Sequence, residues 1–471
     1  MTKAIVRQVE NQVRIIVAGS ELLKPLVAIA TGAATAAETA ETGAVAARNE
    51  AEGFRDEAAD RTAEILGIMG RADLYGIEPL SQAAAFLTGG VEVLPLSGYF
   101  RVGGSEDTAL SDMPGMTITR ASVGYARTVA GTFTSFASGA ARITDRGLLV
   151  EPAATNLFTR FAPTVAQFNA STNTSDATAP ASPPIAGQQW VQVGAGGAGF
   201  AYQTVTLSPS TTYTASIFVE TPDGSSPVGG PNNASTDFSF VMAGVIITAE
   251  THYYLRLSGN VWQVWVTFTT AATVSSTNCG VFRQATQNTR TLKFSGFQVE
   301  AGSRVSSPIV TTGATATRAA DVIQLTGLAI GQEVTVMAEV AVTGAGSATG
   351  GRFLFDLDDG ASANRLYASN SGGFGFATVV SSSTTGSVAV AGPAAIDETV
   401  KLAYRSKAND FRMARGGTLS TADTSGAVPS SFSRLTLGGT SGGTVQLGGF
   451  LRRLVVIPAA LTDAQLQTMS T

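Results

Sequence analysis

Small apolar residues near the N-terminus recur at alternating steps of three and four. The pattern starts at Leu23 and ends at Ile65, and its central positions are Ala37, Ala40, Ala44, Ala47, Ala51, Phe54 and Ala58. Such an a/d repeat predicts a helix that buries its stripe in a coiled coil. Because Gly32, Gly43 and Gly53 each cost about 1 kcal/mol relative to Ala in a helix, we expect the helix to persist only in an oligomer. The alternative is a single amphipathic helix folded onto its own domain.

Two short apolar runs, AIVRQV and QVRIIV, precede this helix and flank Glu10 and Asn11. They predict a short hairpin or an extended docking arm over residues 1–22, ahead of a coiled-coil stalk over 23–66. Residues 67–96 mix Gly, Pro and short apolar pieces, and we interpret them as a connector.

Beyond the connector the hydrophobic period changes from helical spacing to two. In one run Tyr213, Ala215 and Ile217 alternate with Thr and Ser, and the run around Trp262 does the same. Many such short runs separated by Gly, Pro, Ser and Asn turns predict an antiparallel β-sandwich over 97–312. The alternation changes phase at Gly296, which predicts a β-bulge at that position.

A second antiparallel β-sandwich is predicted over 313–471. Its expected strands include EVTVMAEVAV, RFLFDL, NRLYAS, FGFATV, TVKLAYR, DFRMA, RLTLGG and GGFLRRLVVIP. Near the C-terminus, Thr462 with Gln465 three residues later predicts a capping box that opens a short helix. The fold class expected from the whole pattern is therefore mainly β, with an Ala-rich oligomeric stalk followed by two jelly-roll sandwiches.

Composition narrows the possible functions. Charged residues make up only 14% of the chain, against about 25% in average domains, and the net charge is −5. Nucleic-acid binding is not expected, because phosphate contacts need clustered Lys and Arg. No apolar run is long enough for a membrane-spanning helix, and the N-terminus is not of signal-peptide type. The single cysteine, Cys279, permits no intrachain disulfide.

Two segments resemble a known family. RGLLVEPAATNLF (146–158) and SSPIVTTGATATRAADVI (306–323) resemble segments of phage and prophage tail-fibre proteins. The residues between them resemble a carbohydrate-binding-module-like jelly roll, and those after them a concanavalin-A-like or laminin-G-like sandwich. The family's "PART" segment has Ala154 in place of its Arg.

This resemblance implies a virion protein that is made in the bacterial host cytoplasm and assembled on the particle exterior. It implies contact with other virion proteins through the N-terminus, with host surface polysaccharide through the sandwiches, and with two further copies in a trimer. No nucleic acid and no membrane insertion are expected.

Candidate binding residues are few. Sugars stack on exposed aromatic rings, so the stacking candidates are Trp265, Tyr202 and Tyr253, although a second packed layer or a subunit interface would also explain them. The cluster Asp356, Asp358 and Asp359 is a weak candidate for Ca²⁺, and the alternative is an ordinary Asp-Asp-Gly turn. No cofactor is expected.

The expected function is attachment to host glycans without catalysis. A serine hydrolase would have to use His252, and no nucleophile-elbow motif accompanies it. The alternatives are a polysaccharide-degrading tailspike, whose carboxylate pair could form between subunits, and a purely architectural virion decoration.

Overall fold

The computed structural model describes strands at 4–9, 12–17, 91–94, 99–102 and 108–109, and residues 114–471 except 275–276, 288–289, 344–351, 372, 392–393 and 396. The chain divides into two units, Met1–Ser81 and Gln82–Thr471. In the first unit, β1 (Ala4–Val9) and β2 (Gln12–Val17) pair antiparallel, which confirms the predicted hairpin. Its docking role remains a prediction. The predicted stalk, with the seam from Ala37 to Ala58, lies outside the described residues.

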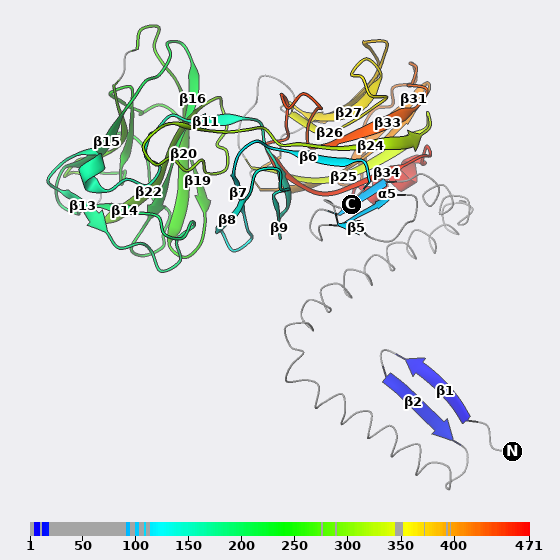
Figure 1. The fold of residues 1–471 in the computed structure, drawn as a ribbon, viewed down its shortest axis with the longest axis horizontal. Coiled ribbons are helices and arrows are strands. Elements are labelled where there is room, and N and C mark those ends of the chain that lie inside the picture. The colour runs from blue at the N-terminus through cyan, green and yellow to red at the C-terminus, as the bar shows by residue number, and fades with distance from the viewer. Residues whose placement is uncertain are drawn as a thin grey trace. The chain divides into compact units, whose positions relative to one another are not determined.

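The second unit is built of antiparallel sheets, as predicted, and contains two sandwiches (Figure 1). We call the one that includes the C-terminus the host sandwich. Its seven-stranded sheet has the order β29–β28–β27–β26–β33–β24–β6, with β6 at Met116–Thr119, β24 at Val322–Ile330, β26 at Arg352–Asp358, β27 at Arg365–Asn370, β28 at Gly373–Val380, β29 at Ser383–Ala391 and β33 at Phe432–Leu437. Its ten-stranded sheet comprises β3 (Val91–Leu94), β4 (Tyr99–Val102), β5 (Thr108–Ala109), β9 (Ile143–Thr144), β10 (Gly147–Val150), β25 (Val334–Val342), β30 (Thr399–Lys407), β31 (Asp410–Arg415), β32 (Thr418–Leu419) and β34 (Gly449–Ile457).

The host core lies between these two sheets. Alternate residues of each strand point inward, so Leu357 and Leu366 of one sheet meet Val336 and Leu454 of the other in one buried cluster. Each such fully buried side chain contributes about 1.5–3 kcal/mol. The period-two runs of the sequence therefore form the core that they predict.

The predicted C-terminal capping box is confirmed. Thr462 caps α5 (Asp463–Met469) by accepting from the backbone N–H of Gln465, whose side chain bonds back to the Thr462 backbone. Leu466 of this helix packs on Ala403 and Ala414, on the outer face of the ten-stranded sheet.

The other sandwich, which we call the inserted sandwich, consists of a five-stranded and a six-stranded sheet. The first has the order β12–β15–β21–β17–β18, with β12 at Asn169–Ala170, β15 at Gly199–Val205, β17 at Ser239–Met242, β18 at Val245–Ile246 and β21 at Thr277–Arg283. The second has the order β13–β14–β22–β16–β20–β19, with β13 at Thr174–Ala177, β14 at Trp190–Val193, β16 at Thr212–Glu220, β19 at His252–Arg256, β20 at Val261–Thr269 and β22 at Leu292–Ala301.

The predicted bulge at Gly296 is also present. The register between β16 and β22 shifts between Ser216 and Phe218, and Gly296 lies there with φ +67°. A Cβ on Gly296 would come within 2.4 Å of the Phe218 ring. Both the backbone conformation and the close ring therefore require glycine here.

The domain boundary differs from the prediction of separate sandwiches over 97–312 and 313–471. Strand β6 pairs with β24, and β10 pairs with β34, so residues before 157 complete both sheets of the host sandwich. Figure 1 shows the cyan strand β6 beside the yellow-green β24. The chain leaves the host through β11 (Ala154–Asn156) and returns through β23 (Ala316–Arg318), which pair antiparallel. The carbohydrate-binding-module-like segment is thus an insertion at 157–315, and the paired β11 and β23 form its neck.

Candidate functional site

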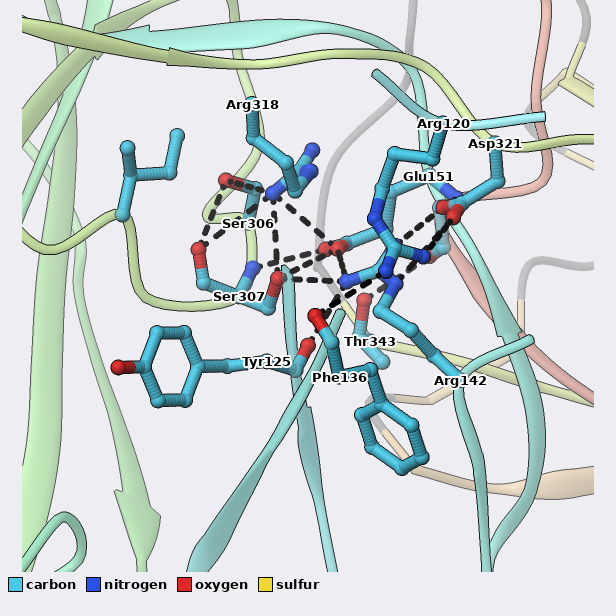
Figure 2. Close-up of polar contacts among 12 residues, drawn as sticks. Arg120, Tyr125, Phe136, Arg142, Glu151, Ser306, Ser307, Arg318, Asp321 and Thr343 are labelled. Atoms are coloured by element: carbon cyan, nitrogen blue, oxygen red, sulfur yellow. Dashed lines mark hydrogen bonds and ion pairs between the residues drawn. The ribbon is translucent and has the colours of Figure 1, made fainter. Parts of the chain in front are cut away.

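A buried network of ions holds the neck to the host sandwich (Figure 2). Its arginines are Arg120 after β6, Arg142 before β9 and Arg318 in β23, and its acids are Glu151 after β10 and Asp321 before β24. Each of these side chains is at most 3% exposed. Buried charges persist only when they are paired and hydrogen-bonded, so every partner of the two carboxylates matters.

Glu151 is held by two arginines and one serine. Its Oε2 lies 2.7 Å from Arg142 Nη1 and 3.2 Å from Arg318 Nη1. Ser307 donates to this carboxylate twice, from its backbone N to Oε1 at 2.8 Å and from its Oγ to Oε2 at 2.6 Å. Burial alone would raise the pKa of Glu151, but Arg318, Arg142 and the Ser307 bonds lower that pKa to about 2.

Asp321 bridges Arg120 and Arg142, so Arg142 is shared by the two carboxylates. Asp321 pairs with Arg120 Nη1 at 3.0 Å and with Arg142, and it accepts the backbone N–H of Glu151 at 2.9 Å. Arg142 also donates to the backbone carbonyl of Tyr125 at 2.7 Å. Tyr125 belongs to β7 (Gly124–Arg127), which pairs with β8 (Phe133–Phe136), so this hairpin is anchored to the same network.

Asn156 secures the end of the neck that faces the inserted sandwich. Its amide nitrogen donates to the carbonyls of Phe297 and Ile309, both at 3.0 Å, and its Oδ1 accepts from the backbone of Phe158 and Val299. The residue is fully buried. It therefore joins the departing strand to the last strand and the exit segment of the insertion.

Segments 146–158 and 306–323 thus meet one another. Glu151 and Asn156 come from the first, and Ser307, Arg318 and Asp321 come from the second. Sequence reasoning missed Arg120 and Arg142, which lie outside both segments. A signal was available for Arg120, which is an isolated charge beside apolar strand residues in a chain with few charges.

The structure corrects the prediction for Trp265. This side chain is only 1% exposed, and Tyr253 on the neighbouring strand stacks on it at 5.5 Å. The alternative of a second packed layer is the better description, because Gln263 and Gln298 on the same face of the six-stranded sheet are also buried. Tyr253 itself is half-buried, and its ring is engaged with Trp265.

Tyr202 lies on an open aromatic face. In β15, Ala201 and Val205 point into the core, so Tyr202 and Phe200 point outward, and their rings stack at 4.8 Å. The opposite strand β21 places Phe282 beside Phe200 and Gly280 beside Tyr202. All three aromatic side chains are half-buried, and burial raises the pKa of Tyr202 to about 12. We call Phe200, Tyr202 and Phe282 the aromatic face.

Gly280 keeps the middle of this face free of a side chain. A Cβ there would lie 2.1 Å from the Ala201 carbonyl oxygen, and the residue has φ +154°. Asn278 and Thr204, which pair across the same two strands, place polar groups next to the rings. The combination of flat rings and nearby polar groups suits a sugar, which presents C–H faces and hydroxyls.

The acidic cluster does not form a common cation site. Asp358 is paired with Arg434 at 2.8 Å, and Asp359 accepts from Asn364 and from the backbone of its own turn. Asp356 lies 3.5 Å from Arg365, and burial raises its pKa to about 7. Within the described part of the chain, no three His, Cys, Asp or Glu residues are arranged to hold a metal ion.

A cavity of about 30 Å³ lies beside the ion network. Glu151, Ser307, Gln263 and Arg127 contribute to its lining together with apolar side chains. It has room for ordered water but not for a sugar ring.

The described helices include none that is long and apolar enough to cross a membrane.

Comparisons with known proteins give similarity of structure only. No protein-family model matches the chain, and no curated protein matches it in sequence. Among solved structures, the Ruminococcus gnavus IT-sialidase CBM40 bound to alpha2,3 sialyllactose is 14% identical, with a TM-score of 0.26, over 32% of this chain and 96% of that chain. Domain 4 of AbnA, a GH43 arabinanase from Geobacillus stearothermophilus, is 15% identical, with a TM-score of 0.26, over 36% and 86%. A pentraxin from Limulus polyphemus is 11% identical, with a TM-score of 0.24, over 31% and 74%. Similarity this low does not identify a ligand.

Proposed function

We propose that this chain is a non-catalytic attachment subunit of a phage-like particle, and that its inserted sandwich binds host-surface glycans. The observation that carries the proposal is the aromatic face of Phe200, Tyr202 and Phe282. Three rings on one sheet surface, around the side-chain-free position of Gly280, offer the flat apolar contact that a pyranose ring needs. Asn278 and Thr204 supply hydrogen-bonding groups at its margin.

Oligomerisation through the N-terminal seam would raise the affinity of weak single contacts. A trimer would display three aromatic faces, and linked sites can gain about 10²–10⁴ in avidity when their geometry allows simultaneous binding. The hairpin β1–β2, ahead of the seam, would dock to other virion proteins. The resemblance of 146–158 and 306–323 to tail-fibre segments supports this placement on the particle exterior.

The test is binding of the purified full chain to envelope polysaccharides of candidate bacterial hosts, measured by surface plasmon resonance. The variants Tyr202→Ala and Phe282→Ala should each weaken binding about tenfold or more, the loss typical of an aromatic anchor. Val129→Ala, which changes a 68% exposed residue on the β7–β8 hairpin, is the control and should bind as the wild type does. Equal binding by all four proteins would contradict the proposal.

Two further measurements distinguish the alternatives. Release of reducing ends from the bound polysaccharide would indicate a degrading enzyme instead of an attachment protein. The aromatic face also continues into Val241 and Ile246, so it could pack against a neighbouring subunit. In that architectural case Tyr202→Ala would lower the mass of the oligomer in solution and leave no glycan binding to lose.

A further inference from the structure

The outer face of the host's seven-stranded sheet carries a second group of aromatic and charged residues. In β26 and β27, Leu357 and Leu366 point into the core, so their strand neighbours Asp356, Tyr367 and Arg365 point outward. The ten-stranded sheet, by contrast, has α5 packed on its outer face. The two faces of the host sandwich therefore differ in what they present.

Two stacked rings form the centre of this face. Phe353 and Tyr367 are parallel within 1° with their centroids 4.3 Å apart. The guanidinium of Arg365 lies over both rings, 5.3 Å from Phe353 and 4.8 Å from Tyr367. Phe353 is 8% exposed while Tyr367 is half-buried, so Tyr367 is the ring that solvent reaches.

The strand next to Tyr367 presents small residues on this face beside the ring and a larger one, Val379, opposite Arg365. Tyr367 pairs with Ala377 in β28, and Gly375 lies two residues before Ala377 on the same side. A Cβ on Gly375 would make only ordinary contacts, the nearest at 3.6 Å, and its φ does not lie in the left-handed region. Packing therefore does not require glycine there. The missing side chain of Gly375 leaves open space on the sheet surface beside the Tyr367 ring.

Asp356 is an independent indication of a ligand. It lies on this face next to Tyr367, is 1% exposed, and its Oδ1 has no hydrogen-bond partner among the described residues. Its other oxygen is 3.5 Å from Arg365, which is long for a hydrogen bond. A buried acceptor without a donor is unfavourable, and a ligand hydroxyl would supply the missing hydrogen bond.

We propose that this face is a second saccharide site, in which a sugar ring stacks on Tyr367 and its hydroxyls bond to Arg365 and to Asp356 Oδ1. The Arg365 side chain is 22% exposed and only weakly tied to Asp356, so a hydroxyl can enter between them. The proposal rests on the proposed function only for the class of ligand, since its residues and its sandwich are different.

The charges on the face favour a neutral sugar over an acidic one. Asp358 is paired with Arg434, through two nitrogens at 2.8 and 2.9 Å, and Arg365 faces Asp356. Above about pH 7, where Asp356 is ionised, this leaves no surplus positive charge next to Tyr367 to bind a carboxylate or sulfate. Binding should consequently change little between low and physiological salt, because counter-ion effects act on net charge.

The test is saturation-transfer difference NMR of the full chain with glucose, galactose, mannose and N-acetylglucosamine, and with glucuronate as the acidic probe. It is run in a Tyr202→Ala/Phe282→Ala background, in which the aromatic face is removed. We expect a signal from at least one neutral sugar, and about a tenfold or greater loss of affinity in that background on Tyr367→Ala. Asp356→Asn should weaken the same sugar's binding, whereas Val129→Ala, on the β7–β8 hairpin, should leave it unchanged.

Three outcomes would overturn the proposal. They are no neutral-sugar signal in the background variant, a signal that Tyr367→Ala leaves intact, and a preference for glucuronate. If sugar binding is lost with Tyr202→Ala/Phe282→Ala alone, the proposed function stands and the second site fails. If Tyr367→Ala lowers the oligomer mass instead, the face is a contact between copies of the chain.

Discussion

Removing the carboxylate of Asp321 should destabilise the host sandwich strongly, because Asp321 holds two buried arginines. In Asp321→Asn, Arg120 and Arg142, which are 1% and 0% exposed, lose their shared negative partner. Arg142 keeps Glu151, but Arg120 keeps only neutral carbonyl acceptors such as Ala137 and Ala140. Breaking a buried ion pair by removing one partner costs about 3–5 kcal/mol.

The assay is differential scanning calorimetry of the full chain together with tryptophan fluorescence. At roughly 2–4 °C per kcal/mol for a domain of this size, the host transition should fall by about 6–20 °C. All three tryptophans, Trp190, Trp262 and Trp265, lie in the inserted sandwich, so fluorescence follows that sandwich separately. We expect the fluorescence transition to move less than the calorimetric transition of the host.

The matched control removes a carboxylate from an exposed pair. Glu333 lies 3.2 Å from Lys407, and these side chains are 50% and 45% exposed. Such pairs contribute about 0–1 kcal/mol, so Glu333→Gln should barely move either transition. If Asp321→Asn shifts the host transition no more than Glu333→Gln does, the network does not hold the neck in the way described.

Three other predictions follow from single residues or connections. Burial raises the pKa of Asp356 from the usual 3.8 to about 7, so the native state loses up to about 4 kcal/mol of stability as pH rises through this interval. By calorimetry, Asp356→Asn should therefore melt at a higher temperature than the wild type at about pH 8 and at the same temperature at about pH 4. Equal differences at both pH values would refute this. Gly296→Ala should lower the urea midpoint of unfolding, followed by fluorescence, far more than Gly187→Ala does. Both glycines have positive φ, but only at position 296 would the new Cβ meet the Phe218 ring. Similar losses in the two variants would mean that the ring relaxes freely. Replacing 157–315 by a two-residue turn should leave a host sandwich that still unfolds cooperatively, because Asn156 and Ala316 are already register partners. Its unfolding temperature should be lower, because Ser307 would no longer donate to Glu151. Loss of the cooperative transition would show that the host depends on its insertion.

Local features were the ones that the sequence predicted well. The bulge at Gly296, the capping box of Thr462 and the hairpin β1–β2 each depend on residues within a few positions of one another. The strand positions of the host sandwich also followed from period-two alternation. These signals are local because backbone conformation and hydrogen bonding at such sites are local.

The features that the sequence did not predict depend on long-range pairing. Nothing near β6 indicates that it joins β24, about two hundred positions later, so the sequence predicts a consecutive domain where the structure has an insertion. Long-range packing also explains the wrong prediction for Trp265. This residue shares a strand face with polar residues, which predicts exposure to solvent, but that face of the six-stranded sheet is buried in the fold. The aromatic face was only partly found, because Tyr202 and Phe282 come together across β15 and β21.

The neck gives the insertion a mechanical consequence that a simple tandem of domains would lack. A single linker lets two domains rotate freely, whereas here β11 and β23 cross together, paired with each other and fixed at one end by Asn156 and at the other by Glu151, Arg318 and Asp321. Separating the two sandwiches would break the Ser307 bonds to Glu151 and the Asn156 bonds to Phe297 and Ile309, and would leave these buried polar groups without partners at a cost of several kcal/mol. Under the proposed function, a held insertion would lose less freedom on binding than a freely rotating one, so weak sugar contacts on the aromatic face would contribute more of their energy to affinity. Segments 146–158 and 306–323 therefore fix the position of the inserted sandwich, whereas the aromatic face that we propose as the binding surface lies elsewhere in the insertion.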